Sequence, residues 1–379
     1  MKNRPFWKNA IEERFREKSI VWLTGVRRAG KTFLCKSFAG IDYFDCELHS
    51  VRRMMEDPEP FLESLRGRRI VLDEIHRLPN PSEILKIAAD HYPDIQIIAT
   101  GSSTLSASAK FKDTLTDRKR ELWLTPMIAN DCESFGNANL RHRFLHGGLP
   151  PFFIHAGYPE RNFQDWIDAF WAKDIQELFR LEKRYSFQKF FELIMAQSGG
   201  IFEASRFASP CEVSRTTISN YLKVMEATFT AHIIRPFSSR KQNEIISAPK
   251  VYGFDTGFVC YYRGWHELRN DDMGYLWEHF VLNELFAHQQ TPNIGYWRDK
   301  QAHEIDFVIN RPGHPPLAIE CKWRDKDFDP ANIKIFLRHY PKARVYVIAH
   351  DINRPYDRKY DGFTVKFINL ANLEMICGV

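Results

Sequence analysis

A short segment near the start of the chain combines glycines, a lysine and a threonine at a spacing that suits phosphate. Residues 25–32 read Gly-Val-Arg-Arg-Ala-Gly-Lys-Thr, a complete G-x-x-x-x-G-K-[ST] motif. Gly25 and Gly30 let the backbone curl without Cβ clashes, so that its N–H groups can face an anion. Lys31 can reach the β- and γ-phosphates of a nucleotide, and the Thr32 hydroxyl can ligate Mg²⁺. The motif predicts a binding site for ATP and Mg²⁺.

The segments on either side of this loop have the right character for it. Residues 19–24 are apolar and partly β-branched, which is typical of a buried strand, and residues 33–38 are typical of the first turns of a helix. A strand, a glycine turn and a helix start together make an anion site. The alternative is a glycine turn with a structural role only.

A second segment ends in two carboxylates. Residues 69–74 read Arg-Ile-Val-Leu-Asp-Glu, which indicates a buried strand followed by acids. In ATPases with a phosphate-binding loop, the first acid holds the Mg²⁺ shell and the second polarises the attacking water. We therefore expect Asp73 to bind Mg²⁺ with Thr32, and Glu74 to act in ATP hydrolysis with Lys31.

Further polar residues follow the next predicted strand, in residues 95–103. Ligands bind at the carboxyl ends of strands in open α/β sheets, so Thr100 or Ser102 could contact the γ-phosphate or the attacking water. A plain turn is the alternative. Beyond them, Arg118 or Arg120 could act as an arginine finger, including one supplied by a neighbouring subunit of a homo-oligomer. A solvated basic loop is the alternative for both arginines.

Two acids and a lysine form another candidate group late in the chain. Residues 304–309 and 317–323 read as two strands joined by a Pro-Gly turn, which indicates a hairpin. Alternation puts Glu320 and Lys322 on one face, and pairing of the strands could bring Asp306 to the same place. Two carboxylates there would bind a divalent metal, and the lysine could orient or activate water. The alternative is an ion cluster without a catalytic role.

The elements between these groups place them in different parts of the fold. A predicted helix over residues 81–90 separates two strands, and this alternation predicts a parallel sheet covered by helices. Residues 165–175 carry aromatic side chains at helical spacing, which favours a core stripe within a helical lid.

Residues 189–237 predict a winged helix-turn-helix. Ser214 is typical of a helix N-cap, and the helix that follows would bury Ile218, Leu222 and Met225. Its first turns would expose small polar and basic side chains, as a recognition helix does toward a DNA major groove: Arg215, Thr216, Thr217, Ser219 and Asn220. Residues 232–237 would be a strand of the wing. Packing without DNA binding is the alternative.

The composition of the chain limits its number of domains, its partners and its compartment only broadly. The chain has 379 residues, enough for two or three domains, and its net charge of +5 permits nucleic-acid binding without arguing for it. Seven cysteines lie far apart without a C-x-x-C pair, which argues against a disulfide framework or zinc site and fits a reducing compartment. With no signal peptide or membrane-spanning run, we expect a soluble cytoplasmic protein without a membrane partner.

The chain as a whole resembles the prokaryotic AAA-type ATPases that carry a C-terminal domain of unknown function, the AAA_14/DUF4143 arrangement. Segments across nearly the whole chain carry this resemblance: residues 25–32, 72–76, 100–103, 124–127, 146–150, 255–257 and 277–281. Asp117-Arg118 departs from the Gly-Arg that the family commonly shows. The C-terminal D…E-x-K pattern also resembles the PD-(D/E)XK nuclease superfamily, in which Glu278 would supply or orient a further ligand.

These observations together predict an α/β protein of four parts. They are a P-loop AAA-type ATPase domain (1–130), a helical lid (131–188), a winged helix-turn-helix (189–240) and a nuclease-like α/β domain (241–379). Our leading hypothesis is an ATP-hydrolysing switch coupled to the C-terminal half, with DNA as a candidate partner. The alternatives are a metal-dependent nuclease regulated by ATP, and a non-catalytic, nucleotide-dependent regulator that binds DNA or protein.

Overall fold

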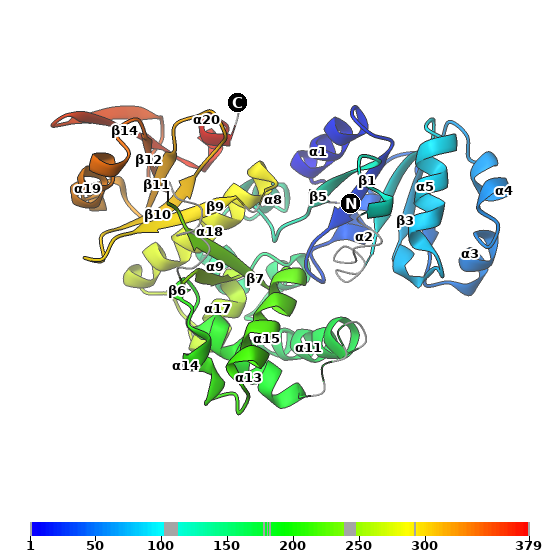
Figure 1. Ribbon diagram of the computed structural model, residues 1–379, viewed down its shortest axis with the longest axis horizontal. Helices are drawn as coiled ribbons and strands as arrows, with labels where there is room; N and C mark the ends of the chain where they lie inside the picture. The colour runs from blue at the N-terminus through cyan, green and yellow to red at the C-terminus, as the bar shows by residue number, and fades with distance from the viewer. Residues whose placement is uncertain are drawn as a thin grey trace.

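The N-terminal sheet lies apart from the C-terminal sheet, with a helical region below and between them (Figure 1). The computed structural model describes residues 2–101, 113–176, 179, 181, 183–238, 248–291 and 293–377.

Five parallel strands form the N-terminal sheet, in the order β2-β3-β4-β1-β5. They are β1 (Ile20–Thr24), β2 (Asp42–Asp45), β3 (Arg69–Asp73), β4 (Gln96–Thr100) and β5 (Lys119–Trp123). Strand β1 is buried along its length because helices cover both faces of the sheet. Its side chains alternate between two cores: Val21 and Leu23 pack on one face, and Ile20 and Trp22 on the other. The predicted parallel, helix-covered sheet is confirmed.

Helices precede and follow the strands in this region. They are α1 (Pro5–Phe15), α2 (Lys31–Lys36), α3 (His49–Met54), α4 (Pro58–Glu63), the 3₁₀ turn η1 (Ile75–Arg77) and α5 (Pro81–His91). Because β1, β3 and β4 are neighbours in the sheet, their carboxyl ends meet at one edge. The loops after these strands therefore gather at the place where the predicted nucleotide residues lie.

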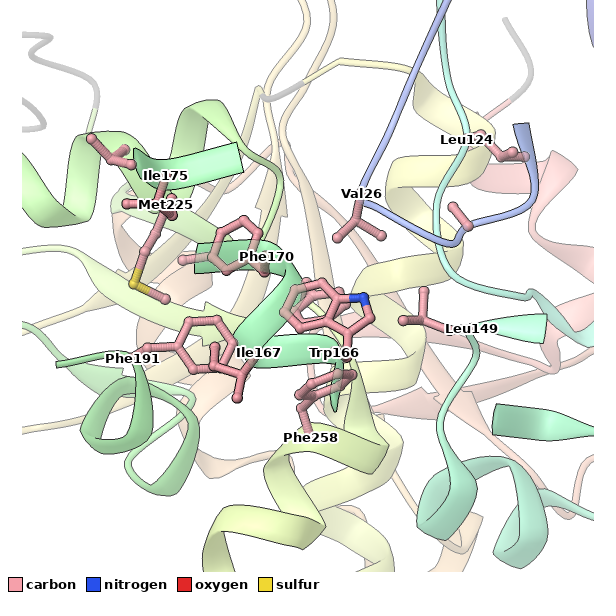
Figure 2. Packing of buried hydrophobic residues seen from close by; sticks show 14 of the residues in the cluster. Val26, Leu124, Leu149, Trp166, Ile167, Phe170, Ile175, Phe191, Met225 and Phe258 are labelled. Atoms are coloured by element: carbon pink, nitrogen blue, oxygen red, sulfur yellow. The ribbon is translucent and has the colours of Figure 1, made fainter. Parts of the chain in front are cut away.

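The middle of the chain is mostly helical. It contains α8 (Ala129–Ser134), α9 (Leu140–His146), α10 (Pro150–Phe153), α11 (Glu160–Phe170), the π-helical turn η2 (Trp171–Gln176), α13 (Arg184–Ala196) and α17 (Thr256–Arg263). The predicted aromatic stripe is a core: Trp166 stacks on Phe170 with ring centroids 4.9 Å apart and meets Phe258 edge-on at 4.8 Å. Figure 2 shows these rings in one cluster that also contains Val26 of the phosphate-binding loop.

A small antiparallel sheet lies within the middle region. Strand β8 (Lys250–Gly253) pairs with both β6 (Gly200–Ile201) and β7 (Ala231–Pro236). Helices α14 (Ala204–Ala208) and α15 (Arg215–Ala227) lie between β6 and β7 in the sequence. From α13 onward the order is therefore helix, strand, helix, helix, strand, strand.

The C-terminal sheet continues this small sheet. Strand β7 pairs in parallel with β9, so that nine strands run in the order β13-β14-β12-β11-β10-β9-β7-β8-β6. The strands before and after the predicted boundary at residue 240 thus share one sheet. The remaining elements are α18 (Asn270–Gln289), β9 (Ile294–Arg298), β10 (Glu304–Ile309), β11 (Leu317–Lys322), η3 (Asp325–Asp327), α19 (Ala331–His339), β12 (Arg344–Ala349), β13 (Tyr356–Tyr360), β14 (Phe363–Ile368), η4 (Leu370–Asn372) and α20 (Glu374–Cys377).

The hairpin predicted late in the chain is present. Strands β10 and β11 are antiparallel, with Phe307 opposite Ile319. The pairing of β10 with β9 shifts register between Ile305 and Val308, and Asp306 lies within this shift. Such bulges redirect side chains and are frequent beside functional sites.

Candidate functional site

The phosphate-binding loop curls between β1 and α2, and its shape depends on two glycines. Gly25 has φ +140°, and a Cβ atom there would lie 2.3 Å from the carbonyl oxygen of Leu124. Gly30, at φ +96°, begins α2 in the left-handed region that favours glycine. Inside the loop, Lys31 Nζ donates hydrogen bonds to the carbonyl oxygens of Gly25 (2.8 Å) and Val26 (3.2 Å). The lysine therefore lies within the loop, where a phosphate would bind.

The two residues predicted to hold Mg²⁺ are in direct contact. Thr32 Oγ1 donates a hydrogen bond to Asp73 Oδ2 at 2.8 Å. The hydroxyl of Tyr43 donates to the same oxygen, and that of Thr100 donates to the other oxygen of Asp73. Asp73 is only 3 % exposed. Carboxylate and hydroxyl oxygens are ligands that suit Mg²⁺, so this group fits the predicted metal.

Glu74 lies next to this group in an unusual backbone conformation. Its φ of +53° and ψ of 42° are left-handed, which non-glycine residues rarely adopt and which is frequent at functional sites. Its N–H donates to Thr100 Oγ1 at 3.0 Å, and its Oε2 lies 3.2 Å from His76 Nδ1. Burial acts to raise the pKa of Glu74, but His76 and Lys31 outweigh it and hold that pKa below its usual value. The side chain is therefore ionised at neutral pH.

The loop and the acids line a pocket of about 1060 Å³. That volume is at the upper end of the range typical of small-ligand pockets. Its basic side chains include Arg27, Arg28, Lys31 and Lys36, which complement the charge of phosphates. The middle region closes one side with Phe170, Lys173, Asp174 and Thr228.

The predicted arginine finger Arg118 is not part of this pocket. The side chain of Arg118 donates to Asp90 at 2.7 Å and 3.1 Å and does not line the pocket, so it is not an arginine finger within its own chain. Its placement follows from the nearby carboxylate on α5. A role for Arg118 in a neighbouring subunit stays a prediction. Ser102 lies outside the described residues.

Two contacts of the pocket were not predicted from the sequence. Tyr43 is at the edge strand β2, and its approach to Asp73 depends on the pairing of β2 with β3, which no local pattern reveals. Asp174 is brought to the pocket by η2, beyond the aromatic helix. An acid within an aromatic stretch is the one signal that could have drawn attention to it.

The residues predicted to form the second group also lie together. Lys322 Nζ donates to Glu320 Oε2 at 2.7 Å and is 3.8 Å from Asp306 Oδ2. Asp306 Oδ2 also accepts a hydrogen bond from the backbone N–H of Cys321 at 2.8 Å. Asp306, Lys322 and Glu278, from α18, line a pocket of about 450 Å³. The sequence pattern therefore located a cluster that the fold brings together.

Negative charge is crowded in this cluster. Burial, with the Asp306 carboxylate next, raises the pKa of Glu320 to about 8 and that of Glu278 to about 7. Glu320 Oε1 is buried and has no hydrogen-bond partner among the described residues. A buried carboxylate oxygen without a partner needs a proton or a cation.

The protein side chains do not complete a metal shell by themselves. Among residues 2–377, outside the masked gaps given above, no group of three His, Cys, Asp or Glu side chains is arranged to hold a metal ion. A metal ion at Asp73 or at Asp306 and Glu320 would take its other ligands from hydroxyls, phosphate oxygens or water.

Three family models match successive parts of the chain. Residues 17–132 match an AAA domain, residues 137–269 match a domain of unknown function (DUF8612), and residues 273–372 match a domain of unknown function (DUF4143). The predicted combination of an AAA domain with DUF4143 is confirmed, and with it an α/β fold and a nucleotide-binding AAA domain. The middle model covers the predicted lid and winged helix together, and their division stays a prediction.

Curated relatives and solved structures add little about function. Two uncharacterized proteins, from Mycobacterium bovis and Mycobacterium tuberculosis, are each 26% identical over 78% of this chain and 68% of their own length. A signal transduction ATPase with a tetratricopeptide repeat sensor from Pyrococcus horikoshii overlaps 76% of this chain and 47% of its own, at 12% identity and TM-score 0.29. A DNA polymerase III gamma subunit-related protein from Thermotoga maritima overlaps 59% and 96%, at 11% identity and TM-score 0.26.

No helix in the described part of the chain is long and apolar enough to cross a membrane.

Proposed function

We propose that the AAA domain of this chain is a Mg²⁺-dependent ATPase that acts as a switch for the C-terminal half. The observation that carries the proposal is the hydrogen bond between Thr32 and Asp73, with Glu74 directly beside it. It joins the phosphate-binding loop to Asp73, and Glu74 is the next residue in the chain. A metal-binding acid followed by a water-orienting acid is the arrangement that such ATPases use.

Each residue of the pocket would have a separate role in ATP binding or hydrolysis, set by its position. Lys31 would exchange its carbonyl partners for phosphate oxygens and so hold the triphosphate in the loop. Thr32 and Asp73 would hold Mg²⁺, which when bound supplies positive charge to the β- and γ-phosphate oxygens. Glu74, ionised at neutral pH, can accept a hydrogen bond from the attacking water and orient it toward the γ-phosphate.

Phosphate release by the full chain tests this proposal. Lys31→Ala should abolish ATP turnover while the thermal unfolding curve stays that of a folded protein. Lys334→Ala is a matched control, because Lys334 is an exposed lysine of α19 that does not line the pocket. Turnover by Lys31→Ala at the wild-type rate would show that the site is elsewhere.

A winged helix-turn-helix in the middle region would be the part that binds DNA. Its element order is that of such a module, and β8 lies between β6 and β7 in the small sheet. Ser214 caps α15 by accepting a hydrogen bond from the N–H of Thr217 at 3.1 Å. The helix buries Ile218 and exposes polar and basic side chains, among them Arg215, Thr216, Asn220 and Lys223. This face suits a DNA major groove.

A second candidate function is metal-dependent hydrolysis of a phosphodiester by the C-terminal cluster. The contact of Lys322 with both carboxylates, and the unpartnered Glu320 Oε1, favour it. Incubation with Mg²⁺ or Mn²⁺ and single-stranded, duplex and branched DNA, with Lys322→Ala in parallel, tests this function. Cleavage that Lys322→Ala lacks supports it, and no cleavage of any DNA form counts against it.

A further inference from the structure

The middle region contacts the phosphate-binding loop at Arg27. Trp166 Nε1, from α11, donates a hydrogen bond to the backbone oxygen of Arg27 at 3.2 Å. The Arg27 side chain forms an ion pair with Asp174 of η2, with Nη1 and Oδ2 3.2 Å apart. Val26, the preceding residue, packs in the same apolar cluster as Trp166 (Figure 2). The loop is therefore held from outside the AAA domain by a hydrogen bond, an ion pair and a core contact.

Asp174 faces the charged groups of the nucleotide pocket. Its pKa is raised by burial, while the positive charges of Arg27 and Lys31 act in the opposite direction. Burial likewise lowers the pKa of Lys31, which the carboxylates of Glu74 and Asp174 oppose. Asp174 thus supplies negative charge to the same cations that a triphosphate would contact.

Arg27 has donor capacity that this arrangement leaves unused. Its Nε is buried and has no hydrogen-bond partner among the described residues. A guanidinium offers five N–H donors, and phosphate oxygens are among its best acceptors. A triphosphate in the pocket would give Arg27 better partners than one carboxylate, and its charge would repel Asp174.

We propose that Asp174 is a triphosphate sensor that belongs to the middle region: it holds Arg27 while the pocket lacks a triphosphate, and it releases η2 when Arg27 turns to the phosphates. This inference rests on the proposed ATP site. It adds the regulation of that site by a residue outside the AAA domain.

Apolar contacts lead from η2 to the predicted recognition helix. Trp171 of η2 packs on Phe187 of α13 with ring centroids 5.8 Å apart. Phe187 meets Tyr221 of α15 at 5.3 Å. Thr228, which caps the end of α15, lines the nucleotide pocket. A π-helical turn holds one residue more than an α-helical turn, so a change to α-helical hydrogen bonding would shift these side chains along their partners.

Affinity for a non-hydrolysable ATP analogue, measured by titration of the full chain, tests the sensor. Asp174→Asn removes the competing charge and should bind the analogue about fivefold tighter or more, with a smaller gain for AMP. Arg27→Gln should bind it more weakly. A purely structural ion pair would weaken binding in both variants, so opposite signs identify the sensor. Asp168→Asn is the matched control, because Asp168 pairs with Arg184 on the exposed side of α11 at 2.5 Å.

Hydrogen exchange of residues 171–176 gives a second readout. The analogue should speed exchange there in the wild type, and Asp174→Asn should exchange fast without it. If the wild type binds the analogue but Asp174→Asn binds equally or more weakly, the sensor is wrong and the ATP site stands. If the wild type does not bind it, the ATP site itself is wrong and the sensor is wrong with it.

Discussion

Thr32 donates a 2.8 Å hydrogen bond to Asp73, a residue 41 positions later in the chain. This bond places the end of β3 against the start of α2, and the hydroxyls of Tyr43 and Thr100 orient the same carboxylate from two other strands. Three hydroxyl donors on one buried carboxylate fix its orientation before any ligand binds. A preorganised group of this kind is what a Mg²⁺–phosphate site requires.

Tyr43 is expected to position Asp73. Tyr43→Phe keeps the ring but removes the hydroxyl, so the carboxylate loses one of the bonds that orient it. We expect kcat to fall about three- to tenfold, the Mg²⁺ concentration for half-maximal rate to rise, and nucleotide affinity to change little. Tyr185→Phe is the control, because Tyr185 is 68% exposed. An unchanged Mg²⁺ dependence would contradict this role.

Glu74→Gln should separate ATP binding from hydrolysis. The amide keeps the shape of the side chain but cannot polarise water as a carboxylate does, so we expect kcat to fall by about 10²-fold or more while the ATP analogue still binds. Single-turnover measurements with labelled ATP check this. Equal losses of binding and turnover would point to a structural role instead.

The same residue gives a pH dependence with a defined sign. Because its folded-state pKa lies below the ordinary 4.5, Glu74 stays ionised as pH falls through that value. Its contribution to stability is present above pH 4.5 and is lost as pH falls through the lower, folded-state pKa. We expect the acid limb of the pH–rate profile to lie below pH 4.5. The limb should be absent from the residual rate of Glu74→Gln.

Glu320 should affect stability with the opposite sign. Its pKa is raised to about 8 by burial, so the folded state binds a proton that the unfolded state releases near pH 4.5. Stability therefore falls as pH rises from about 4.5 to 8, and Glu320→Gln should remove this fall. We expect the variant to be more stable than the wild type at pH 8.5, by an amount on the order of 1–3 kcal/mol, and the difference to shrink at pH 5.

Chemical denaturation at the two pH values measures this difference. Asp299→Asn is the control, because Asp299 is an acid near β10 that pairs with His303 at 2.7 Å, outside the cluster. The difference in free energy of unfolding between Glu320→Gln and the wild type should be larger at pH 8.5 than at pH 5. An equal difference at the two pH values would contradict the raised pKa. If Mn²⁺ raises the melting temperature of the wild type but not of Glu320→Gln, the cluster binds the metal.

The exposed start of α15 should contact DNA. Arg215→Ala should weaken duplex binding about threefold to tenfold and reduce the steepness with which affinity falls as salt rises, because one phosphate or base contact is lost. Arg358→Ala on the distant edge strand β13 is the control. Equal effects of the two substitutions would show that binding depends on net charge rather than on this helix.

Local motifs were sufficient to predict which residues the fold gathers around the phosphate-binding loop, but not the contacts that surround them. The phosphate-binding loop and Asp73-Glu74 are recognisable because the backbone geometry itself demands glycine, lysine and acids at fixed spacing. Arg118 differs: its basic neighbourhood suggested phosphate chemistry, yet in this chain the nearer partner is Asp90 on α5. A charged side chain pairs with an opposite charge that lies close to it. Which charge lies close to Arg118 depends on how α5 packs, and the local sequence does not show this packing.

Contacts between distant strands and helices were beyond local reasoning. Tyr43 reaches Asp73 because β2 pairs with β3, and Asp174 reaches Arg27 because a π-helical turn ends α11. The junction of the middle and C-terminal sheets was missed for the same reason. Strand β7 forms ladders with β8 and β9 at once, and a sequence shows strands without showing their neighbours.

That junction has a mechanical consequence. Because β7 joins both ladders, the sheet beside α15 and the sheet that carries Asp306 and Glu320 share backbone hydrogen bonds and cannot turn separately without breaking them. If α15 binds DNA, the shared sheet keeps the carboxylate cluster of Asp306 and Glu320 at a fixed distance from the bound duplex. Any conformational change driven at the nucleotide pocket would then move α15 and the carboxylate cluster together, as one body, relative to the N-terminal sheet.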